Sequence, residues 1–173
     1  DGAWYLRGWY DDGSALGSSA SRECRIDAIA QAWAVLSGAG EPARAEQAVR
    51  SAVERLVRSD EGLVLLLTPP FDRSVEDPGY IRAYPPGVRE NGGQYTHGAV
   101  WLLWALARLG DGARAAALFR RLLPLRHARD RAAAERYRLE PYALAADVYG
   151  APPHVGRGGW SWYTGAAGWT WRF

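Results

Sequence analysis

Hydrophobic residues recur at helical spacing in four long segments of the chain. In each segment apolar side chains lie three or four positions apart, which is typical of a helix with one face in the core. The pattern predicts helices over residues 24–37, 43–59, 97–109 and 113–123. Short connections that contain glycine join the first helix to the second and the third to the fourth. Such connections predict two antiparallel helical hairpins.

The last third of the chain has a weaker helical pattern. Residues 142–149 follow Pro141 and are predicted to form a short helix. Residues 164–171 are predicted to form another, despite their glycines. Together these two segments predict a third helical unit.

Three connections are much longer than those inside the hairpins, and they cover residues 60–96, 124–140 and 150–163. Loops of this length are uncommon in compact domains unless they carry function. In the first of them, residues 62–67 and 80–84 have strand-like patterns bounded by prolines, which predict a small β-hairpin. Long connections gathered on one side of the helices predict that this side is the active-site face.

The order of elements predicts an all-α fold. Short and long connections that alternate between helical hairpins are what an α/α toroid requires, with inner and outer helices paired around a central cleft. A helical solenoid is the alternative, but it would show a sequence repeat of fixed period, and the sequence contains none. With 173 residues, 48% of them hydrophobic, the chain is predicted to form one domain or one large piece of a domain.

Composition argues against several classes of protein. The net charge of +2 comes from 21 basic and 19 acidic residues. Because the two signs are so evenly mixed, the chain lacks the basic stripe of a nucleic-acid-binding protein. The one cysteine, Cys24, excludes a disulfide framework and has no Cys or His neighbours for a zinc site. We therefore expect no metal and a reducing compartment.

The ends of the chain and its hydropathy suggest a soluble fragment. No apolar run approaches the roughly 20 residues that span a bilayer, and Asp1 is followed by no signal-like layout. The chain has no initiator methionine and begins abruptly on aromatic residues. We therefore expect a soluble piece of a longer protein whose beginning lies elsewhere.

Aromatic residues are abundant, with nine Trp and nine Tyr. Many of them lie near glycines rather than inside apolar runs, where flat faces suit the apolar CH faces of sugar rings. Core packing is the alternative for any single ring. As a set, the aromatic residues favour a carbohydrate cleft, and they are Trp4, Trp9, Trp160, Trp162, Trp169 and Trp171 with Tyr5, Tyr10, Tyr80, Tyr84, Tyr95 and Tyr163.

Residues 82–97 are the most informative segment. They place arginine, glutamate, asparagine, tyrosine and histidine side chains among glycines and prolines, which suits a polar pocket better than a core. Arg89 and Glu90 lie at its centre, and the nearby glycines would let the backbone approach a ligand closely. The alternative for this pair is an exposed surface ion pair of little energetic value.

Two long loops lead into predicted helix N-termini, the first at His97 and the last at Thr164 and Gly165. Free N–H groups and the positive end of the helix dipole make such positions good anion sites, and phosphate is the expected anion. The alternatives are that Thr164 is only a helix N-cap and that His97 is only a loop hydrogen-bonding residue.

Other carboxylates are weaker candidates for acid catalysis. Asp11 and Asp12 precede Gly13 in a good turn pattern. Glu23 and Asp27 flank the predicted start of the first helix, where they would serve helix electrostatics.

Four motifs follow one another along the chain: ECRIDAIAQAWAVLSG, RAYPPGVRENGGQYTHGAVW, LEPYALAADVYG and HVGRGGWSWYTGAAGW. They resemble the C-terminal part of the catalytic domain of glycoside hydrolase family 94, and the likeness runs from about Trp4 to Trp171. The chain is most similar to the phosphorylase-like domain of cyclic β-1,2-glucan synthases, and the family also contains cellobiose and chitobiose phosphorylases.

The resemblance implies an (α/α)6 barrel and inverting phosphorolysis of a β-glucoside. It implies that His97, Thr164 and Gly165 bind phosphate. Tyr84, Arg89 and Glu90 match positions that contact sugar, although some members have Lys in place of Arg. The implied partners are a β-glucan or oligosaccharide and inorganic phosphate as co-substrate, with no other cofactor and no nucleic acid.

The sequence departs from the family in lacking the Asp-Trp-Asn-Asp-like motif that carries the general acid. The resemblance places that acid, and a phosphate-binding arginine, upstream of this region. We therefore expect no catalytic acid in this chain and little or no turnover by it alone. The rest of the parent protein would complete the barrel and hold any membrane-spanning segments, in the cytoplasm or on the cytoplasmic face of the inner membrane.

Two other functions stay open at this point: an inverting hydrolase on the same barrel, in which water replaces phosphate, and a non-catalytic glucan-binding module. An incomplete toroid would expose helix faces, so we also expect self-association into a homo-oligomer.

Overall fold

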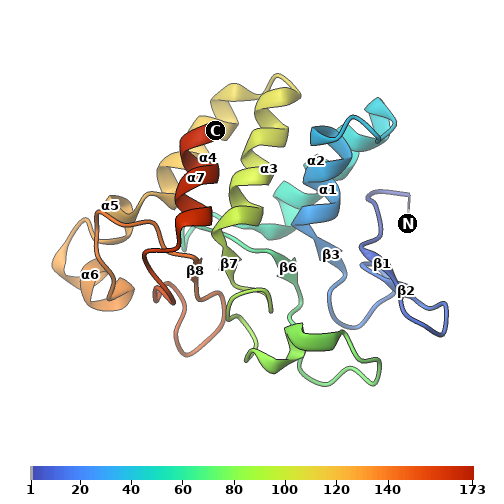
Figure 1. Cartoon of the computed structure of the whole chain (residues 1–173), viewed down its shortest axis with the longest axis horizontal. Helices are drawn as coiled ribbons and strands as arrows, with labels where there is room; N and C mark the ends of the chain where they lie inside the picture. The colour runs from blue at the N-terminus through green and yellow to red at the C-terminus, as the bar shows by residue number, and fades with distance from the viewer. Residues whose placement is uncertain (1) are drawn as a thin grey trace.

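Three helices stand side by side in the computed structural model of the chain, which describes residues 2–173 (Figure 1). They are α1 (Ala28–Leu36), α3 (Thr96–Arg108) and α7 (Thr164–Arg172), with α3 in the middle and packed against both others. Their N-terminal ends all lie on the side of the molecule that carries the short strands and long loops (Figure 1). Residues far apart in the sequence therefore meet on this loop face.

Two further helices pack behind this row. α2 (Pro42–Leu56) follows α1, and α4 (Gly112–Leu122) follows α3, each after a short connection. The two predicted antiparallel hairpins are confirmed, with helix ends within a few residues of the predicted ones. The first helix differs most, because Ile26 and Asp27 form a strand and Asp27 then caps α1 through its side chain.

Burial explains the helical pattern. One face of each long helix is apolar, and these faces form the main core, which includes Val49 and Leu56 of α2 with Leu102, Leu103 and Leu106 of α3. A smaller cluster of Cys24, Leu67, Phe71 and Ile81 lies under the loops. Removing this much apolar surface from water is the main force that holds the helices together.

The strands are all two residues long and pair in four separate antiparallel ladders: β1 (Gly8–Trp9) with β2 (Ala15–Leu16), β3 (Ile26–Asp27) with β6 (Leu67–Thr68), β4 (Val57–Arg58) with β5 (Leu63–Val64), and β7 (Gln94–Tyr95) with β8 (Asp147–Val148). The predicted hairpin between residues 62–67 and 80–84 is wrong. Residues Gly79–Ala83 form a 3-10 helix, and the apolar run at residues 62–67 pairs instead with segments on either side of α1 and α2.

Two other expectations need correction. The predicted helix over residues 142–149 is wrong, because Asp147 and Val148 are drawn into pairing with β7. The connection over residues 124–140 holds two short helices that the sequence analysis missed, α5 (Pro124–His127) and α6 (Arg131–Tyr137). The fold is therefore predominantly helical, as predicted, with more local structure in the loops than the sequence indicated.

Candidate functional site

Strand pairing brings the two most informative loops together. β7 leads directly into α3, and its partner β8 lies in the segment that leads to α7. Thr96 strengthens the junction, since its N–H donates to the carbonyl of Ala146 at 2.9 Å and its hydroxyl donates to the carbonyl of Ala145 at 2.7 Å. The N-terminal ends of α3 and α7 are held next to each other by this arrangement.

His97 lies between these two helix ends, surrounded by aromatic rings. Its imidazole stacks on Tyr95 at a centroid distance of 5.1 Å and contacts Trp101 and Tyr163 edge-on at 5.8 and 5.4 Å. A Cβ placed on Gly165 would lie 2.6 Å from His97 Nε2. Only a glycine therefore leaves room for the imidazole to lie against the first turn of α7.

The electrostatics favour an uncharged imidazole. Burial lowers the pKa of His97, and the neighbouring Glu90 only partly opposes this effect. Burial and a hydrogen bond with Tyr163 raise the pKa of Tyr95. In the described residues, Nδ1 of His97 is buried and has no hydrogen-bond partner. A polar ligand would find an unused nitrogen here.

Neither helix N-terminus at this site has a side-chain cap, a feature shared with the four-residue helix α5. Asp27, Glu41, Asp111 and Asp130 cap α1, α2, α4 and α6 through side-chain hydrogen bonds. In α3 and α7 the N-cap residues are Tyr95 and Tyr163, and neither makes a side-chain capping bond. The alternative that Thr164 is the N-cap is wrong, because Thr164 is already the first helical residue. Free N–H groups remain in both first turns.

Arg89 and Glu90 form the second part of the site. Their side chains are only 19% and 16% exposed, so the alternative of an exposed surface pair is wrong. The Arg89 guanidinium carbon lies 5.4 Å from the Tyr84 ring and 5.2 Å from the Trp160 ring, which are cation–π distances. The two charged groups approach to 3.6 Å, too far for a good hydrogen bond. Arg89 Nε and Glu90 Oε2 are both buried without hydrogen-bond partners in the described residues.

The glycines of this loop serve the fold rather than a ligand. A Cβ on Gly87 would lie 2.4 Å from the Cβ of Ala151, and one on Gly93 would lie 2.9 Å from the carbonyl of Gly87. The space that we expected a ligand to use is filled by the protein's own backbone. Asn91, which is fully buried, closes the loop by bonding to the backbone of Phe71 and Tyr84.

Asp147, which was not among the predicted site residues, connects the two loops of the site. Its side chain is fully buried, with Oδ2 accepting from the Arg89 N–H at 3.1 Å and Oδ1 accepting from the Trp160 N–H at 3.2 Å. Burial raises the pKa of this carboxyl, although both N–H donors oppose the change. Asp147 thus fixes the loops that carry Arg89 and Trp160. Its position after an alanine-rich apolar run resembled a helix, so no sequence signal separated it from a surface residue.

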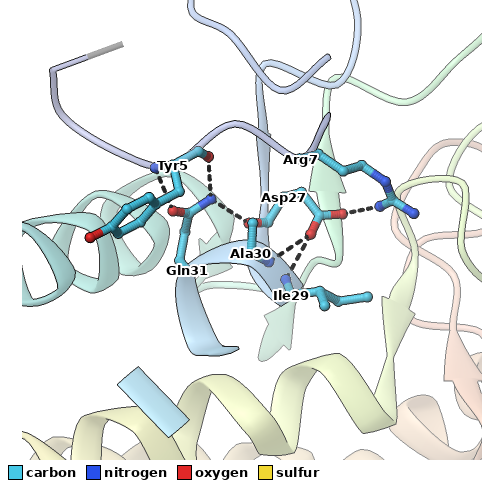
Figure 2. A network of polar contacts seen from close by, with 6 residues as sticks. All are labelled: Tyr5, Arg7, Asp27, Ile29, Ala30 and Gln31. Carbon is cyan, nitrogen blue, oxygen red and sulfur yellow. Dashed lines mark hydrogen bonds and ion pairs between the residues drawn. The ribbon is translucent and has the colours of Figure 1, made fainter. Parts of the chain in front are cut away.

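The other carboxylates are engaged in the fold. Asp12 accepts from the Ser14 N–H and hydroxyl in the predicted turn. Glu23 accepts from the N–H groups of Arg73 and Ser74 in the loop at residues 72–74. Asp27 pairs with Arg7 and caps α1 (Figure 2). The turn and helix-start interpretations are confirmed for Asp12 and Asp27, and none of these groups lies in the site.

Only part of the predicted aromatic set lies at the site. Trp9, Tyr80 and Trp171 are exposed and, in the described residues, make no ring contact with His97 or Arg89. Trp4 is buried and donates its indole N–H to the carbonyls of Gly17 and Arg25, and Trp169 packs against Trp101 and Trp104. These rings are part of the core. Tyr84, Tyr95, Trp160 and Tyr163 surround His97 and Arg89, as expected of a cleft.

Residues 2–173 can be compared with the requirements of a membrane-spanning helix and of a metal site. No helix in this range is both long and apolar enough to cross a membrane. The same range contains no cluster of three or more His, Cys, Asp and Glu side chains arranged to hold a metal ion. Burial raises the pKa of the Cys24 thiol to about 12, so this cysteine remains protonated near neutral pH.

A comparison with known protein families identifies the family of the chain. The model of the glycosyl hydrolase 94 superfamily, catalytic domain, matches residues 1–173. The chain belongs to this superfamily. Its resemblance to glycoside hydrolase family 94, first noted on sequence motifs, is confirmed over the whole chain.

This glycosyl hydrolase 94 chain is similar in sequence to a glucan synthase and to several phosphorylases. It is 52% identical to the cyclic beta-(1,2)-glucan synthase NdvB of Rhizobium meliloti over 99% of this chain and 6% of the relative. It is 35% identical to the solabiose phosphorylase of Paenibacillus borealis over 99% of this chain and 22% of the relative. It is 32% identical to the N,N'-diacetylchitobiose phosphorylase of Vibrio proteolyticus over 98% of this chain and 21% of the relative. The chain thus spans about a fifth of the two phosphorylases and far less of the synthase.

Proposed function

We propose that the chain is the C-terminal part of a phosphorylase-like (α/α)6-barrel catalytic domain and forms one wall of its cleft. Family membership and the names of the relatives support this proposal. The row of α1, α3 and α7 with α2 and α4 behind it is also what part of such a barrel would look like (Figure 1). The remaining inner and outer helices would then come from the rest of the parent protein.

The proposal that this site binds phosphate rests on one observation. His97, Thr164 and Gly165 lie together where the uncapped N-termini of α3 and α7 converge. Both helix dipoles point their positive ends at this place, and free N–H groups can donate to phosphate oxygens. The hydroxyl of Thr164 and a ring nitrogen of His97 would add further hydrogen bonds. Gly165 lets the anion and the imidazole approach the helix backbone together.

Tyr84, Arg89 and Glu90 would bind the sugar. Glu90 can accept and Arg89 can donate, and each has a buried polar atom without a partner in the described residues. Sugar hydroxyls both donate and accept, so they suit this pair. The Tyr84 ring, held by the Arg89 guanidinium, would lie against the apolar face of the same sugar.

In the reaction that follows from this arrangement, a phosphate oxygen forms a bond to the anomeric carbon while the β-glucosidic C–O bond breaks. The leaving oxygen takes a proton from a general acid that belongs to another part of the domain. The product is a sugar 1-phosphate of inverted configuration. Since general acid catalysis contributes about 10²–10⁴ in rate, the chain alone should have little or no turnover.

Hydrolysis on the same barrel is the second candidate. It would release free glucose instead of glucose 1-phosphate, and it would need no anion site at the ends of α3 and α7. A non-catalytic glucan-binding module would give saturable quenching of tryptophan fluorescence by oligoglucan with no product. The uncapped helix ends favour phosphorolysis over both.

His97→Ala in the intact parent enzyme tests the proposal. We expect the KM for phosphate to rise about tenfold or more, because a hydrogen bond to a charged group contributes roughly 1.5–3 kcal/mol. The fold should survive, because the imidazole is only partly buried. His154→Ala is the matched control, because His154 is exposed and lies outside the site. Unchanged phosphate dependence in His97→Ala would show that the assignment is wrong.

A further inference from the structure

A second group of charged side chains surrounds a cavity of about 220 Å³ at another part of the chain. The cavity is formed by the β4–β5 turn, the end of α4, the helices α5 and α6, and the loop before α7. α5 and α6 lie at one edge of the loop face (Figure 1). Its lining residues differ from those proposed to bind phosphate or sugar. The basic ones, which define what is here called the arginine cavity, are Arg121, Arg126, His127, Arg129 and Arg136.

Positive charge is in excess in the arginine cavity. Four arginines and two carboxylates, Asp60 and Glu61, line it, so two positive charges remain unbalanced. Within residues 2–173, the side chains of Arg126 and Arg136 form no ion pair and no hydrogen bond. Both guanidinium groups therefore have all their donors available for a ligand.

The packing around the cavity holds its basic groups in place. A Cβ placed on Gly156 would lie 3.1 Å from Cδ of Arg136, so this glycine leaves the space beside the arginine stem. The His127 imidazole stacks on the buried ring of Tyr137 at a centroid distance of 5.1 Å. Nε2 of His127 is buried and has no hydrogen-bond partner in the described residues. A buried nitrogen without a partner is costly, and a bound ligand could provide the missing bond.

The basic groups are close enough to act on one another. Burial lowers the pKa of His127, and the charges of Arg126 and Arg136 lower it further. A bound anion would offset the repulsion between these groups. Its oxygens could accept hydrogen bonds from both guanidinium groups and from an imidazole protonated at Nε2.

We propose that the arginine cavity binds a phosphate group, as a second anion site separate from the one at His97. Guanidinium groups present forked donors that match phosphate oxygens. The oxygens of a tetrahedral phosphate point in several directions, so they can meet donors from α5 and α6 together, whereas a carboxylate has only two oxygens in one plane. The cavity is smaller than the roughly 300–1,000 Å³ of sites for drug-sized ligands, which suits inorganic phosphate or the phosphate of a small sugar ester.

Equilibrium dialysis with radiolabelled inorganic phosphate tests this site in the intact parent protein. His97→Ala is the starting protein, because it weakens the anion site at α3 and α7. Adding Arg126→Gln and Arg136→Gln should raise the Kd of the cavity for phosphate about a hundredfold, about tenfold for each lost hydrogen bond to a charged group. Arg131→Gln is the matched control: this arginine also lies on α6, but it pairs with Glu135, is 93% exposed and should not affect binding.

Equal phosphate binding with and without the two cavity substitutions, or an equal loss in Arg131→Gln, would overturn the inference. Circular dichroism checks the fold of each variant, and Arg136→Gln alone should raise the Kd about tenfold. Acetate that competes as well as phosphate at constant ionic strength would also refute a phosphate site.

Glucose 1-phosphate distinguishes the two sources of the phosphate group. If it binds more tightly than inorganic phosphate, the cavity takes a sugar phosphate, and the reverse order assigns it to the free ion. The inference does not depend on the proposed function, which is tested separately by the KM for phosphate in His97→Ala. If that KM is unchanged, the comparison with and without the cavity substitutions still decides the arginine cavity.

Discussion

Two buried aspartates organise opposite ends of the loop face, and they use their hydrogen bonds differently. Asp27 is part of a closed network: one carboxylate oxygen accepts from the N–H groups of Ile29 and Ala30, and the other pairs with Arg7 (Figure 2). Gln31 extends it by bonding the backbone of Tyr5 through both its amide oxygen and nitrogen (Figure 2).

Asp147 instead supports a site that is left open. It accepts from the N–H groups of Arg89 and Trp160 and has no cationic side chain paired with it in the described residues. Three buried side-chain atoms of this site have no hydrogen-bond partner in the described residues, namely Arg89 Nε, Glu90 Oε2 and His97 Nδ1. Buried polar atoms without partners are costly, and they are expected where a ligand provides the missing bonds. The first network holds the fold, and the second holds groups ready to bind.

Charge in the two networks follows the same division. Burial alone would lower the pKa of Arg7, but the Asp27 carboxylate, with contributions from Cys24 and Tyr80, raises it. His97 makes no ion pair in the described residues, so burial lowers its pKa and the nearby Glu90 opposes this change only in part. Burial also raises the pKa of Asp27, although Arg7 and the N–H groups of Ala30 and Ile29 oppose this change. The contact between the Arg7 and Asp27 side chains nevertheless gives the first network an ion pair that His97 lacks in the described residues.

The largest predicted effect is on the closed network. Asp27→Ala should lower the free energy of unfolding by about 3 kcal/mol, because it leaves Arg7 without its partner and removes the cap of α1. Chemical denaturation measures this loss. The control is Asp12→Ala, an exposed turn residue, which should leave the free energy of unfolding nearly unchanged. Comparable losses in the two variants would contradict a structural role for the Asp27 network.

Asp147→Asn should have an intermediate effect on stability and a clear one on substrate use. The amide retains only one acceptor atom, so one of the two N–H donors loses its partner, at a cost of roughly 1–3 kcal/mol. The KM for the sugar substrate should rise more than the KM for phosphate, because Arg89 and Trp160 shift while His97 stays. Asp130→Asn is the control, since Asn caps a helix as well as Asp does. A change in stability alone would mean that Asp147 does not position the site.

The smallest effect on stability, and the most selective one on function, is expected from glycine substitution in α7. Gly165→Ala should displace the His97 imidazole, because the new Cβ would lie 2.6 Å from Nε2, and it should raise the KM for phosphate several-fold. Gly168→Ala on the same helix meets no atom within 4 Å and should stabilise the protein by up to about 1 kcal/mol. If the two variants had the same KM for phosphate, His97 would not belong to the anion site.

Local pattern was enough to predict the five longest helices, but not α5 or α6, and it pointed to several residues of the candidate site. Helical periodicity predicts α1 to α4 and α7 because one face of each helix is buried. Leu102 and Leu106, four positions apart and both buried, show this spacing in α3. The unusual polarity of residues 82–97 likewise indicated a pocket, because Arg89, Glu90 and His97 have no place in a core. The family motifs added the roles expected of these residues.

Tertiary structure decided what the pattern could not. Asp147 and Val148 resemble a helix locally but pair with β7, because a strand partner distant in sequence satisfies their backbone bonds. Whether Trp4 packs in the core or Trp160 joins the site depends on contacts that no single segment contains. The sequence by itself determined which groups are available to bind. The pairing of β7 with β8, and the packing of α3 on α7, decided that His97 and Gly165 meet, because only long-range contacts bring two helix ends to one place.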